Sequence, residues 1–470
     1  MTSRLLQRKP LERFFAEAEG RAGGHALKRA LGPIDLVMLG IGGIIGTGIF
    51  VLTGVAAVDH AGPAVVASFA VAGLACGLAG LCYAEFATLI PISGSAYSYA
   101  YATLGEIIAW VIGWDLILEY AVAASAVASG WSGYFRVILH TLGIDLPAAI
   151  AHAPGTAEGA LVNLPALLVI LAVSTLLVIG IRESARANAV IVALKLAVIL
   201  FVIVAGFSHV DTANWHPFAP YGWNGVMAGG AIVFFSYIGF DCVTTAAEES
   251  RNPERDMPIG ILGSLAVCTL LYLAVSAIVT GMVPLAQIDR TAPLASAFHD
   301  VGLGFAAGLI SIGAIVGLTS VLLVLLLGQS RIFLAMSRDG LMPKLFGRIH
   351  PRFRTPHVST IIVGLIVAVL SGLTPLTVLV ELVSIGTLFA FVLVSAGVLV
   401  LRRIQPDLRR PFRCPWVPVV PVLAIVACGY LMASLPGVTW LRFVVWLGVG
   451  LVIYFSYGRH HSRMAQPAES

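Results

Sequence analysis

Long apolar stretches follow one another through almost the whole of this 470-residue chain. A bilayer core of about 30 Å is crossed by about 20 apolar residues of helix, and 59% of the residues are hydrophobic whereas 11% are charged. Runs of this length disfavour membrane β-strands, which are short and alternate in polarity. The sequence therefore predicts an all-α integral membrane protein of about 12 transmembrane helices. We expect the spans near residues 33–57, 62–89, 103–135, 163–182, 186–207, 225–249, 257–284, 304–337, 357–373, 376–402, 415–435 and 438–457.

The basic residues lie between these spans rather than within them. Cytoplasmic loops of membrane proteins retain Lys and Arg, and most of the 28 Lys and Arg residues fall on one side if both termini lie there. This pattern predicts a multi-pass protein of the cell membrane (inner or plasma membrane) with cytoplasmic N- and C-termini. Lys195 is then the one basic residue expected at membrane depth.

The order of the spans suggests four parts. Residues 1–30 are polar and basic, without the apolar run of a signal peptide, and we expect a cytoplasmic tail there. A first five-helix repeat is expected over 31–207 and a second over 208–402. Because five is an odd number, the second repeat would have the inverted orientation. Two further helices and a cytoplasmic C-terminal tail are expected over 403–470.

The composition narrows the class of function. No loop is long enough to be a separate domain, so the function must reside in the membrane. All eleven histidines map to loops, tails or interfaces, and the six cysteines show neither a disulfide framework nor a metal-binding spacing. We therefore expect no enzyme, no cofactor and no metal. The net charge of +4 arises from the loops and gives no indication of nucleic acid binding, so a transporter or a channel remains.

The first span contains the stretch IGGIIGTGIFVLTG, which has five glycines. Each glycine costs about 0.5–1 kcal/mol relative to alanine inside a helix. One interpretation is that Gly42 and Gly46 form a small-residue packing face. The other is a break, after which Thr47 and Gly48 begin a second half-helix whose N–H groups suit a carboxylate.

The sixth span has a matching irregularity, FFSYIGFDCVTTAAEE, with Ser236, Gly239 and Asp241 near its middle. Paired interrupted helices at corresponding places of two inverted repeats indicate a binding site at the membrane midplane. Exposed carbonyl groups in the unwound part of this span suit an ammonium group. The pair of breaks therefore favours a site for an amino acid over simple packing.

Charged residues inside membrane spans are expensive and usually functional. Asp115 and Glu119 are four residues apart and share one face of the third span. A buried lysine such as Lys195 is either part of a structural ion pair or a group whose protonation responds to physiological pH. The charged residues expected within spans are Glu85, Asp115, Glu119, Lys195, Asp241 and Glu381. For Glu85 and Glu381, we favour a structural hydrogen bond at a helix end or between helices over a functional role.

Several stretches resemble the amino acid, polyamine and organocation transporters, and within them the bacterial relatives of the cationic amino acid transporters. They are LGIGGIIGTGIF, CYAEFATLIPISGSAYSYAY, GWDLILEY, FFSYIGFD with EESRNPERDMPIGI, and SIGTLFAFVLVSAGVLVLRR. The resemblance covers nearly the whole chain. It implies two inverted five-helix repeats, helices 1–5 and 6–10, plus helices 11 and 12. Animal members have more spans, and some bacterial relatives recruit a small single-span subunit and a sterol-like lipid.

The resemblance also implies roles for individual residues. Thr47 and Gly48 would hold the substrate carboxylate through backbone N–H groups. Phe235 would also form an aromatic lid, and Glu119 lies where a substrate side chain would end. The residues that would line the pocket and offer carbonyl groups to the substrate ammonium are Ile44, Phe235, Ser236 and Ile238.

In proton-coupled members, a lysine of helix 5 takes the place of a bound cation. The stretch ANAVIVALKLAVI puts Lys195 at that position. Protonated, Lys195 would donate hydrogen bonds to carbonyl groups of the unwound Gly42–Gly43 region. Deprotonation would release this contact and favour the inward-facing state, which makes Lys195 the expected proton switch.

Together these features predict a secondary active transporter for L-amino acids of the arginine, lysine and alanine class, driven by protons in symport. No Walker motif indicates coupling to ATP. An amino acid exchanger and a polyamine carrier stay open as alternatives, although a polyamine has no carboxylate for the amides of Thr47 and Gly48. A channel is disfavoured because two half-helix breaks do not form a ring of pore-lining charge.

Overall fold

The computed structural model describes residues 8–10, 31–90, 95–179, 185–353 and 355–462. Within these ranges the secondary structure is helical, and the only β contact is an isolated bridge between Leu31 and Ser250. The predicted all-α class is therefore confirmed.

In the part of the chain that the structure describes, twelve apolar helical segments cover the spans expected from the sequence. Eight are long and apolar enough to cross a membrane: Gly48–Leu89, Glu106–Thr141, Ala189–Phe207, Gly222–Thr245, Pro253–Met282, Gly304–Arg338, Leu376–Ile404 and Gly437–His461. Four shorter apolar helices complete the set: α3 (Pro33–Ile44), α9 (Leu164–Ile179), α16 (His357–Leu373) and α18 (Val419–Ala433).

The remaining bounds define the elements used below. The long helices are α5 (Val65–Leu89), α7 (Glu106–Thr141), α10 (Ala185–Phe207), α11 (Gly222–Val233), α13 (Pro253–Met282), α15 (Gly304–Arg338), α17 (Leu376–Ile404) and α19 (Gly437–Ile453). The short ones are α4 (Thr53–Ala56), α6 (Ser95–Thr103), α8 (Ala148–Ala151), α12 (Cys242–Thr245), α14 (Pro293–Asp300) and α20 (Arg459–His461).

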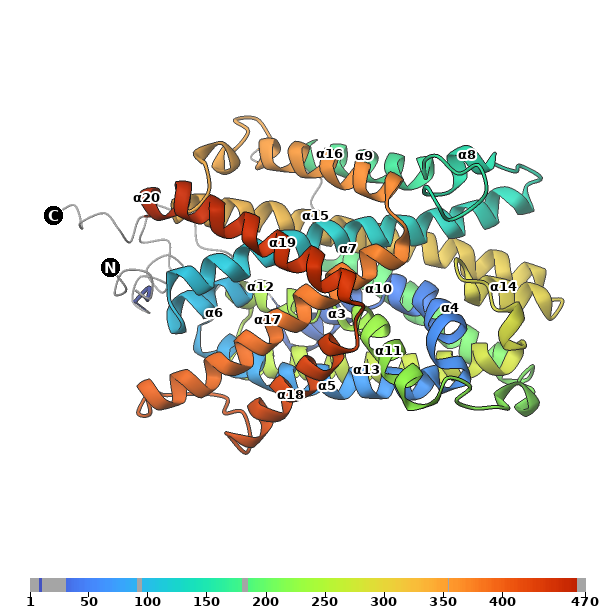
Figure 1. Cartoon of the computed structure of the whole chain (residues 1–470), viewed down its shortest axis with the longest axis horizontal. Coiled ribbons are helices and arrows are strands. Elements are labelled where there is room, and N and C mark those ends of the chain that lie inside the picture. Colours follow the sequence, from blue (N-terminus) through green and yellow to red (C-terminus); the bar gives the residue numbers. More distant parts are fainter. Residues whose placement is uncertain (1–7, 11–30, 91–94, 180–184, 354, 463–470) are drawn as a thin grey trace.

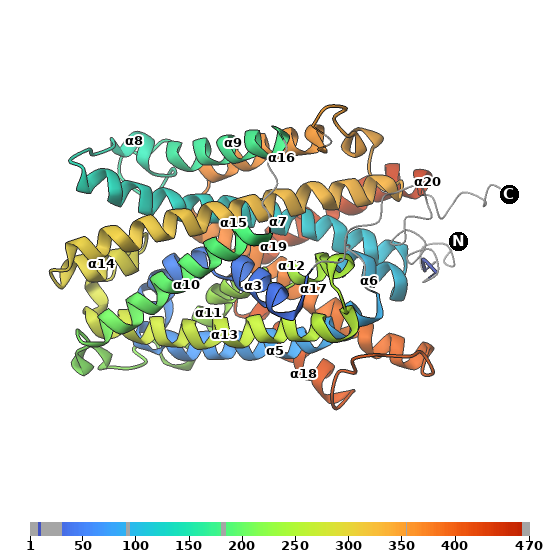
Figure 2. The same cartoon turned by 180° about the vertical axis from the view of Figure 1, so that it is seen from behind.

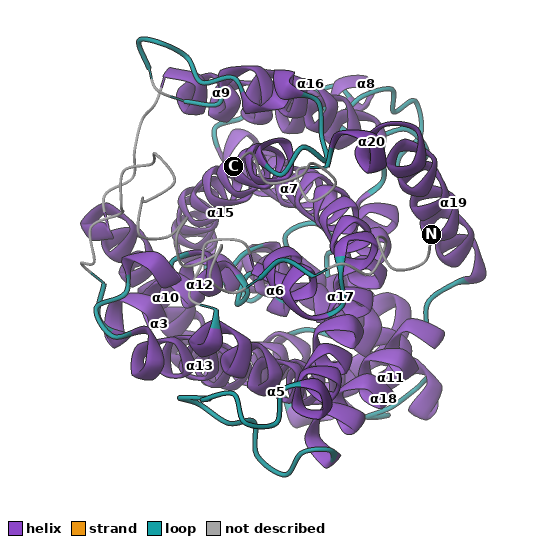
Figure 3. Cartoon of the chain, turned by 90° about the vertical axis from the view of Figure 1, so that its left-hand side faces the viewer, coloured by secondary structure: helices purple, strands orange, loops and turns teal. Residues whose placement is uncertain are grey.

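The helices form an elongated bundle with α6 and α20 at one end (Figure 1). Helix α15 packs along α7, α13 packs on α3 and α5, and α17 packs on α7. The pair α9 and α16 lies on one side of the bundle, as the reverse view also shows (Figure 2). Seen from the end that carries α6 and α20, α18 and α19 lie at the periphery (Figure 3). We call this end, which α6 and α20 define, the termini end.

Large apolar side chains point away from the bundle. Val204 and Phe207 on α10 and Val452 on α19 are among the most exposed of them. An apolar outer surface of this kind is stable in lipid, where helices satisfy their own backbone hydrogen bonds. The surface therefore agrees with the composition in placing this chain in a membrane.

Both predicted breaks are present. Helix α3 ends at Ile44, Ile45 is extended with a ψ of 100°, and a π-helical turn begins at Gly48. The sixth span passes from α11 through a 3₁₀ turn to Ile238, which is extended with a ψ of 136°. Gly239 follows with a φ of 113°, a backbone conformation that favours glycine. Each span is thus two half-helices joined by irregular backbone.

Of the predicted N-terminal tail, only residues 8–10 are described, and Lys9 packs against the bundle. Lys9 is 6% exposed, and its Nζ lies 3.2 Å from Oδ1 of Asp339 at the end of α15. Its backbone N–H donates to the carbonyl of Tyr101 in α6. This short segment therefore joins two helices at the termini end.

Candidate functional site: the paired helix breaks

The two helix breaks lie directly against each other in the middle of the bundle. A Cβ atom added at Gly43 would lie 3.1 Å from the carbonyl oxygen of Gly239, and one added at Gly239 would lie 2.6 Å from that of Gly43. A Cβ at Gly48 would collide with Ser236. Only glycine fits these approaches. The glycines that permit this approach are Gly43 and Gly48, whereas the packing interpretation rested on Gly42 and Gly46.

Gly46 has more room than Gly43 and Gly48. A Cβ added there would lie 3.4 Å from Cγ2 of Val321 on α15, which is close to an ordinary van der Waals contact. Val321 therefore borders the first break from the side of α15.

One tyrosine hydroxyl joins the two breaks. Tyr272 on α13 is fully buried, and its Oη lies 2.9 Å from the carbonyl oxygen of Ile44 and 2.7 Å from that of Ser236. The hydroxyl has a single proton, which it donates to one of these carbonyl oxygens or shares between them, and each oxygen keeps a lone pair for another donor. Sequence reasoning missed Tyr272 because a tyrosine within an apolar span gives no signal of charge or backbone irregularity.

Lys195 reaches the first break from α10. Its Nζ donates to the carbonyl oxygens of Gly42 at 2.9 Å and Ile45 at 3.2 Å, and the side chain is 1% exposed. Its stem runs along Gly317 of α15, where a Cβ would lie 3.1 Å from Cε of the lysine. The expected contact with the unwound segment is present, but it involves Gly42 and Ile45, whereas the carbonyl of Gly43 lies against Gly239.

Two buried hydroxyl groups at the breaks have no hydrogen-bond partner in the structure. They belong to Thr47, which packs on Gly130 of α7, and to Ser236, which contacts Gly48. A buried polar group without a partner costs about 1–3 kcal/mol. Proteins keep such groups where a ligand or a water molecule satisfies them. The predicted lining residues Ile44, Phe235 and Ile238 are buried beside these hydroxyls, on the same two breaks.

Acidic side chains gather next to the second break. Glu119 on α7 is buried, and it lies near enough to Asp241 and Asp115 to interact with their charges. Asp241 accepts from the hydroxyl of Tyr120 at 3.4 Å. The predicted acidic position is therefore beside the break.

Asp115 was expected to share a helix face with Glu119, and it is one turn away in α7. It packs against Gly386 of α17, where a Cβ would lie 2.6 Å from its Oδ1, and neither of its carboxylate oxygens has a hydrogen-bond partner. Asp115, Glu119 and Asp241 together give this region the capacity to attract a cation or to bind protons. Within the described ranges, no His, Cys, Asp and Glu side chains form a group that could hold a metal ion.

Comparison with known proteins agrees with this geometry. Residues 31–455 match the family model described as amino acid permease. The chain belongs to the amino acid permease family. This membership makes the protein a membrane transporter.

Relatives of this permease align over almost the whole chain. It is 50% identical to the methylthioribose transporter of Bacillus subtilis (strain 168) over 98% of this chain and 99% of the relative. It is 51% identical to the branched-chain amino acid permease BcaP of the same organism over 99% of this chain and 100% of the relative. Identity to the vacuolar cationic amino acid transporter 4 of Arabidopsis thaliana is 34%, over 94% of this chain and 93% of the relative.

Proposed function

We propose that this permease carries L-amino acids into the cell together with protons, by alternating access. The observation that carries the proposal is the Lys195 ammonium, which donates to the carbonyl oxygens of Gly42 and Ile45 at the break of the first span. A titratable group in this position links the protonation state of the protein to the shape of the break. In this proposal both termini are cytoplasmic, as the distribution of Lys and Arg favours.

The two breaks supply complementary partners for a zwitterion. A helix that begins at Gly48 leaves the N–H groups of its first turn without intrahelical partners, and these groups suit a carboxylate. The carbonyl groups beside the second break, with the hydroxyl of Ser236, suit an ammonium. The substrate in this arrangement lies between Thr47 and Ser236, whose buried hydroxyls both lack partners.

For the substrate side chain, we propose a neutral aliphatic group. Apolar residues line this part of the breaks, among them Ile44, Phe235 and Ile238. The similarity to a protein named as a branched-chain amino acid permease supports this choice. A cationic amino acid is the second candidate, because Glu119, Asp241 and Asp115 lie together beside the second break.

The test is uptake of labelled leucine into proteoliposomes under an imposed inward proton gradient without sodium. Accumulation that collapses when a protonophore dissipates the gradient supports symport. Uptake that needs internal amino acid and ignores the gradient would instead establish an exchanger, and single-channel currents would establish a channel.

Competition identifies the substrate. The uptake of labelled leucine is measured in the presence of an equal excess of each of five compounds: alanine, valine, arginine, putrescine and methylthioribose. Strong competition by valine with little by arginine supports a neutral aliphatic substrate. Methylthioribose is an uncharged sugar derivative, so its competition in place of valine would mean that the breaks bind hydroxyl groups rather than a zwitterion. Competition by putrescine alone would favour a polyamine carrier.

A further inference from the structure

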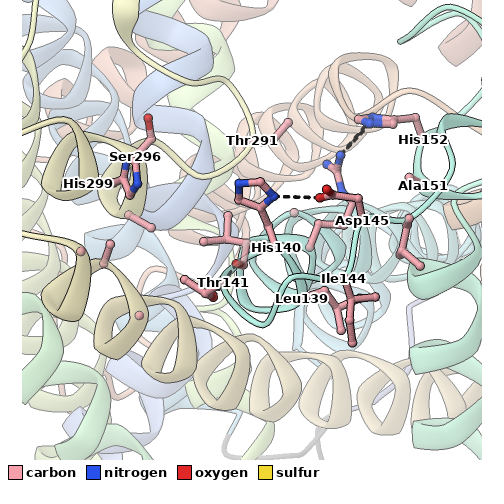
Figure 4. Close-up of a pocket in the computed structure, with 18 residues that line it drawn as sticks. Leu139, His140, Thr141, Ile144, Asp145, Ala151, His152, Thr291, Ser296 and His299 are labelled. Atoms are coloured by element: carbon pink, nitrogen blue, oxygen red, sulfur yellow. Dashed lines mark hydrogen bonds and ion pairs between the residues drawn. The ribbon is translucent and has the colours of Figure 1, made fainter.

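A cavity lies at the end of the bundle opposite α6 and α20, away from the helix breaks. Its volume is about 480 Å³, and it is enclosed by the last turns of α7, the segment around α8, the helix α14 and the first turns of α15. Figure 4 shows polar side chains around it. They include Arg136, His140, His152, Thr291, Ser296 and His299. None of the proposed substrate-site residues lines this cavity, which we call the end pocket.

Arg136 is the only arginine or lysine among the residues that line the end pocket, and its hydrogen bonding is incomplete. Its Nη1 donates to the imidazole of His152, with 2.7 Å to Nε2 and 3.2 Å to Nδ1. Its Nε is buried and has no hydrogen-bond partner. Burial and the neighbouring guanidinium lower the pKa of His152, so this imidazole is neutral at pH 7. The charge of Arg136 is therefore not neutralised by its hydrogen-bond partner.

The acidic residues around the end pocket are engaged elsewhere. Asp145 lies 2.8 Å from Nδ1 of His140, as the dashed line in Figure 4 marks. Asp289, the carboxylate that most influences Arg136, accepts from the backbone N–H groups of Thr291 and Ala292 and from the Thr291 hydroxyl. Across the described residues, no carboxylate forms an ion pair with Arg136.

A partly buried guanidinium that forms no ion pair among the described residues is unusual, because buried charges in proteins are normally paired. The planar fork of an arginine side chain matches a carboxylate in two parallel hydrogen bonds. The volume of the end pocket falls within the range of small-molecule sites, and Ile144, Ala151 and Ala307 add apolar wall. We propose that the end pocket binds a carboxylate-bearing small molecule through Arg136, at a site separate from the helix breaks.

The first test uses acetate, because acetate has the carboxylate but no ammonium group. Thermal unfolding of the detergent-purified protein is followed as sodium acetate replaces sodium chloride at constant ionic strength. A ligand that binds the folded state raises the apparent Tm. We expect this rise in the unsubstituted protein and its loss in Arg136→Gln. Arg442→Gln removes an exposed guanidinium of α19 outside the pocket and should keep the full rise.

Three results would overturn the proposal: no acetate-dependent rise, a rise that persists in Arg136→Gln, or an equally large Arg136-dependent rise with phosphate.

Protection from chemical modification gives a second measurement that needs no variant. Acetate should slow the reaction of Arg136 with phenylglyoxal several-fold in the unsubstituted protein, as measured by mass spectrometry of peptides. Unchanged reactivity at Arg136 would also contradict binding there.

The substitution Gly48→Val distinguishes the two sites, because it crowds the helix breaks and leaves the end pocket intact. We expect this variant to keep the acetate-dependent rise. If the rise disappears, acetate binds at the breaks and the proposal fails. If leucine also raises the Tm of Gly48→Val in an Arg136-dependent manner, the amino acid itself is a ligand of the end pocket. If acetate raises the Tm of Gly48→Val and leucine does not, the end pocket binds acids that lack an ammonium group. Either result shows which kind of carboxylate the end pocket binds.

Discussion

At the scale of single residues, the proposed proton coupling depends on the role of Lys195. It is buried, and its ammonium holds two carbonyl oxygens of the first break. Loss of a proton removes the charge from these hydrogen bonds, and bonds that involve a charged group are about twice as strong as neutral ones. In the proposed mechanism, protonation of Lys195 would therefore stabilise the arrangement of the break seen here, and deprotonation would release it.

We predict that Lys195→Ala abolishes accumulation of substrate driven by a proton gradient, whereas exchange across the membrane or binding in detergent persists. Lys195→Gln is the matched variant, because the glutamine side chain keeps a hydrogen-bond donor but does not gain or lose a proton near neutral pH. It separates the loss of the hydrogen bond from the loss of the titratable group. Both variants should lose gradient-driven uptake in sodium-free proteoliposomes. If either still concentrates substrate in response to the gradient, the proton switch lies elsewhere.

Glu119 is the residue that tests substrate charge. An ionised carboxylate in a poorly hydrated site attracts a distal cation much more strongly than it does in bulk water. Glu119→Gln should weaken arginine binding and leave leucine and alanine binding largely intact, as measured by ligand-induced thermal stabilisation. If the binding of all three amino acids falls together, Glu119 has a structural role beside Asp241.

Some of the site residues could be predicted from the sequence and others could not. Gly43, Gly48 and Gly239 carry a local signal, because a glycine in an apolar span is unfavourable and therefore informative. Tyr272 and Arg136 carry none. Their roles depend on which groups surround them in three dimensions: two carbonyl oxygens for Tyr272 and an incomplete set of partners for Arg136.

At the scale of helical elements, the spans were predictable because membrane insertion depends on summed hydrophobicity over about 20 residues. The two breaks were predictable as interruptions, but their mutual contact was not. Contact between Gly43 and Gly239 depends on how α3 and α12 pack against α13, and this packing is not encoded in either stretch alone. The inverted orientation of the repeats remains a prediction.

The contact between breaks predicts different outcomes for two neighbouring glycines. Gly48→Val introduces a Cβ where Ser236 already lies and should abolish transport. Membrane insertion should persist because the hydrophobicity of the span is kept. Gly46→Ala is the matched control, since its Cβ would meet Val321 at a tolerable 3.4 Å. The measurement is uptake normalised to the amount of inserted protein. Normal transport by inserted Gly48→Val would mean that the close approach of the breaks has no role in substrate binding.

At the scale of the whole molecule, the helices have little hydrophobic driving force for packing on one another, because lipid is as apolar as their side chains. Hydrogen bonds and ion pairs between distant segments therefore contribute more to holding the helices in one arrangement. Tyr97 and Lys9 both contact Asp339 at the termini end, which joins α6 and the N-terminal segment to α15. The six cysteines are all free and buried in the structure, so no disulfide bond among them joins distant segments.

The strongest of these contacts is centred on Glu85 of α5, which is 1% exposed. Its carboxylate pairs with Arg402 of α17 at 2.7 Å and with Arg410 of the following segment at 3.2 Å, and it accepts from the backbone N–H of Cys414 at 2.8 Å. One buried carboxylate thus holds two guanidinium groups and a loop. Breaking a buried ion pair by removal of one partner typically costs about 3–5 kcal/mol.

This geometry predicts an asymmetry between the partners of the ion pair. Glu85→Gln leaves two guanidinium groups close together without a counter-charge and should lower the apparent Tm of the purified protein strongly. Arg402→Gln should have the smaller effect, because Arg402 is partly exposed and Arg410 still neutralises the carboxylate. Thermal unfolding of both variants in one detergent measures the difference. Equal Tm values for the two variants would show that the charges at this end are compensated by solvent, and that α5 and α17 are held together by packing instead.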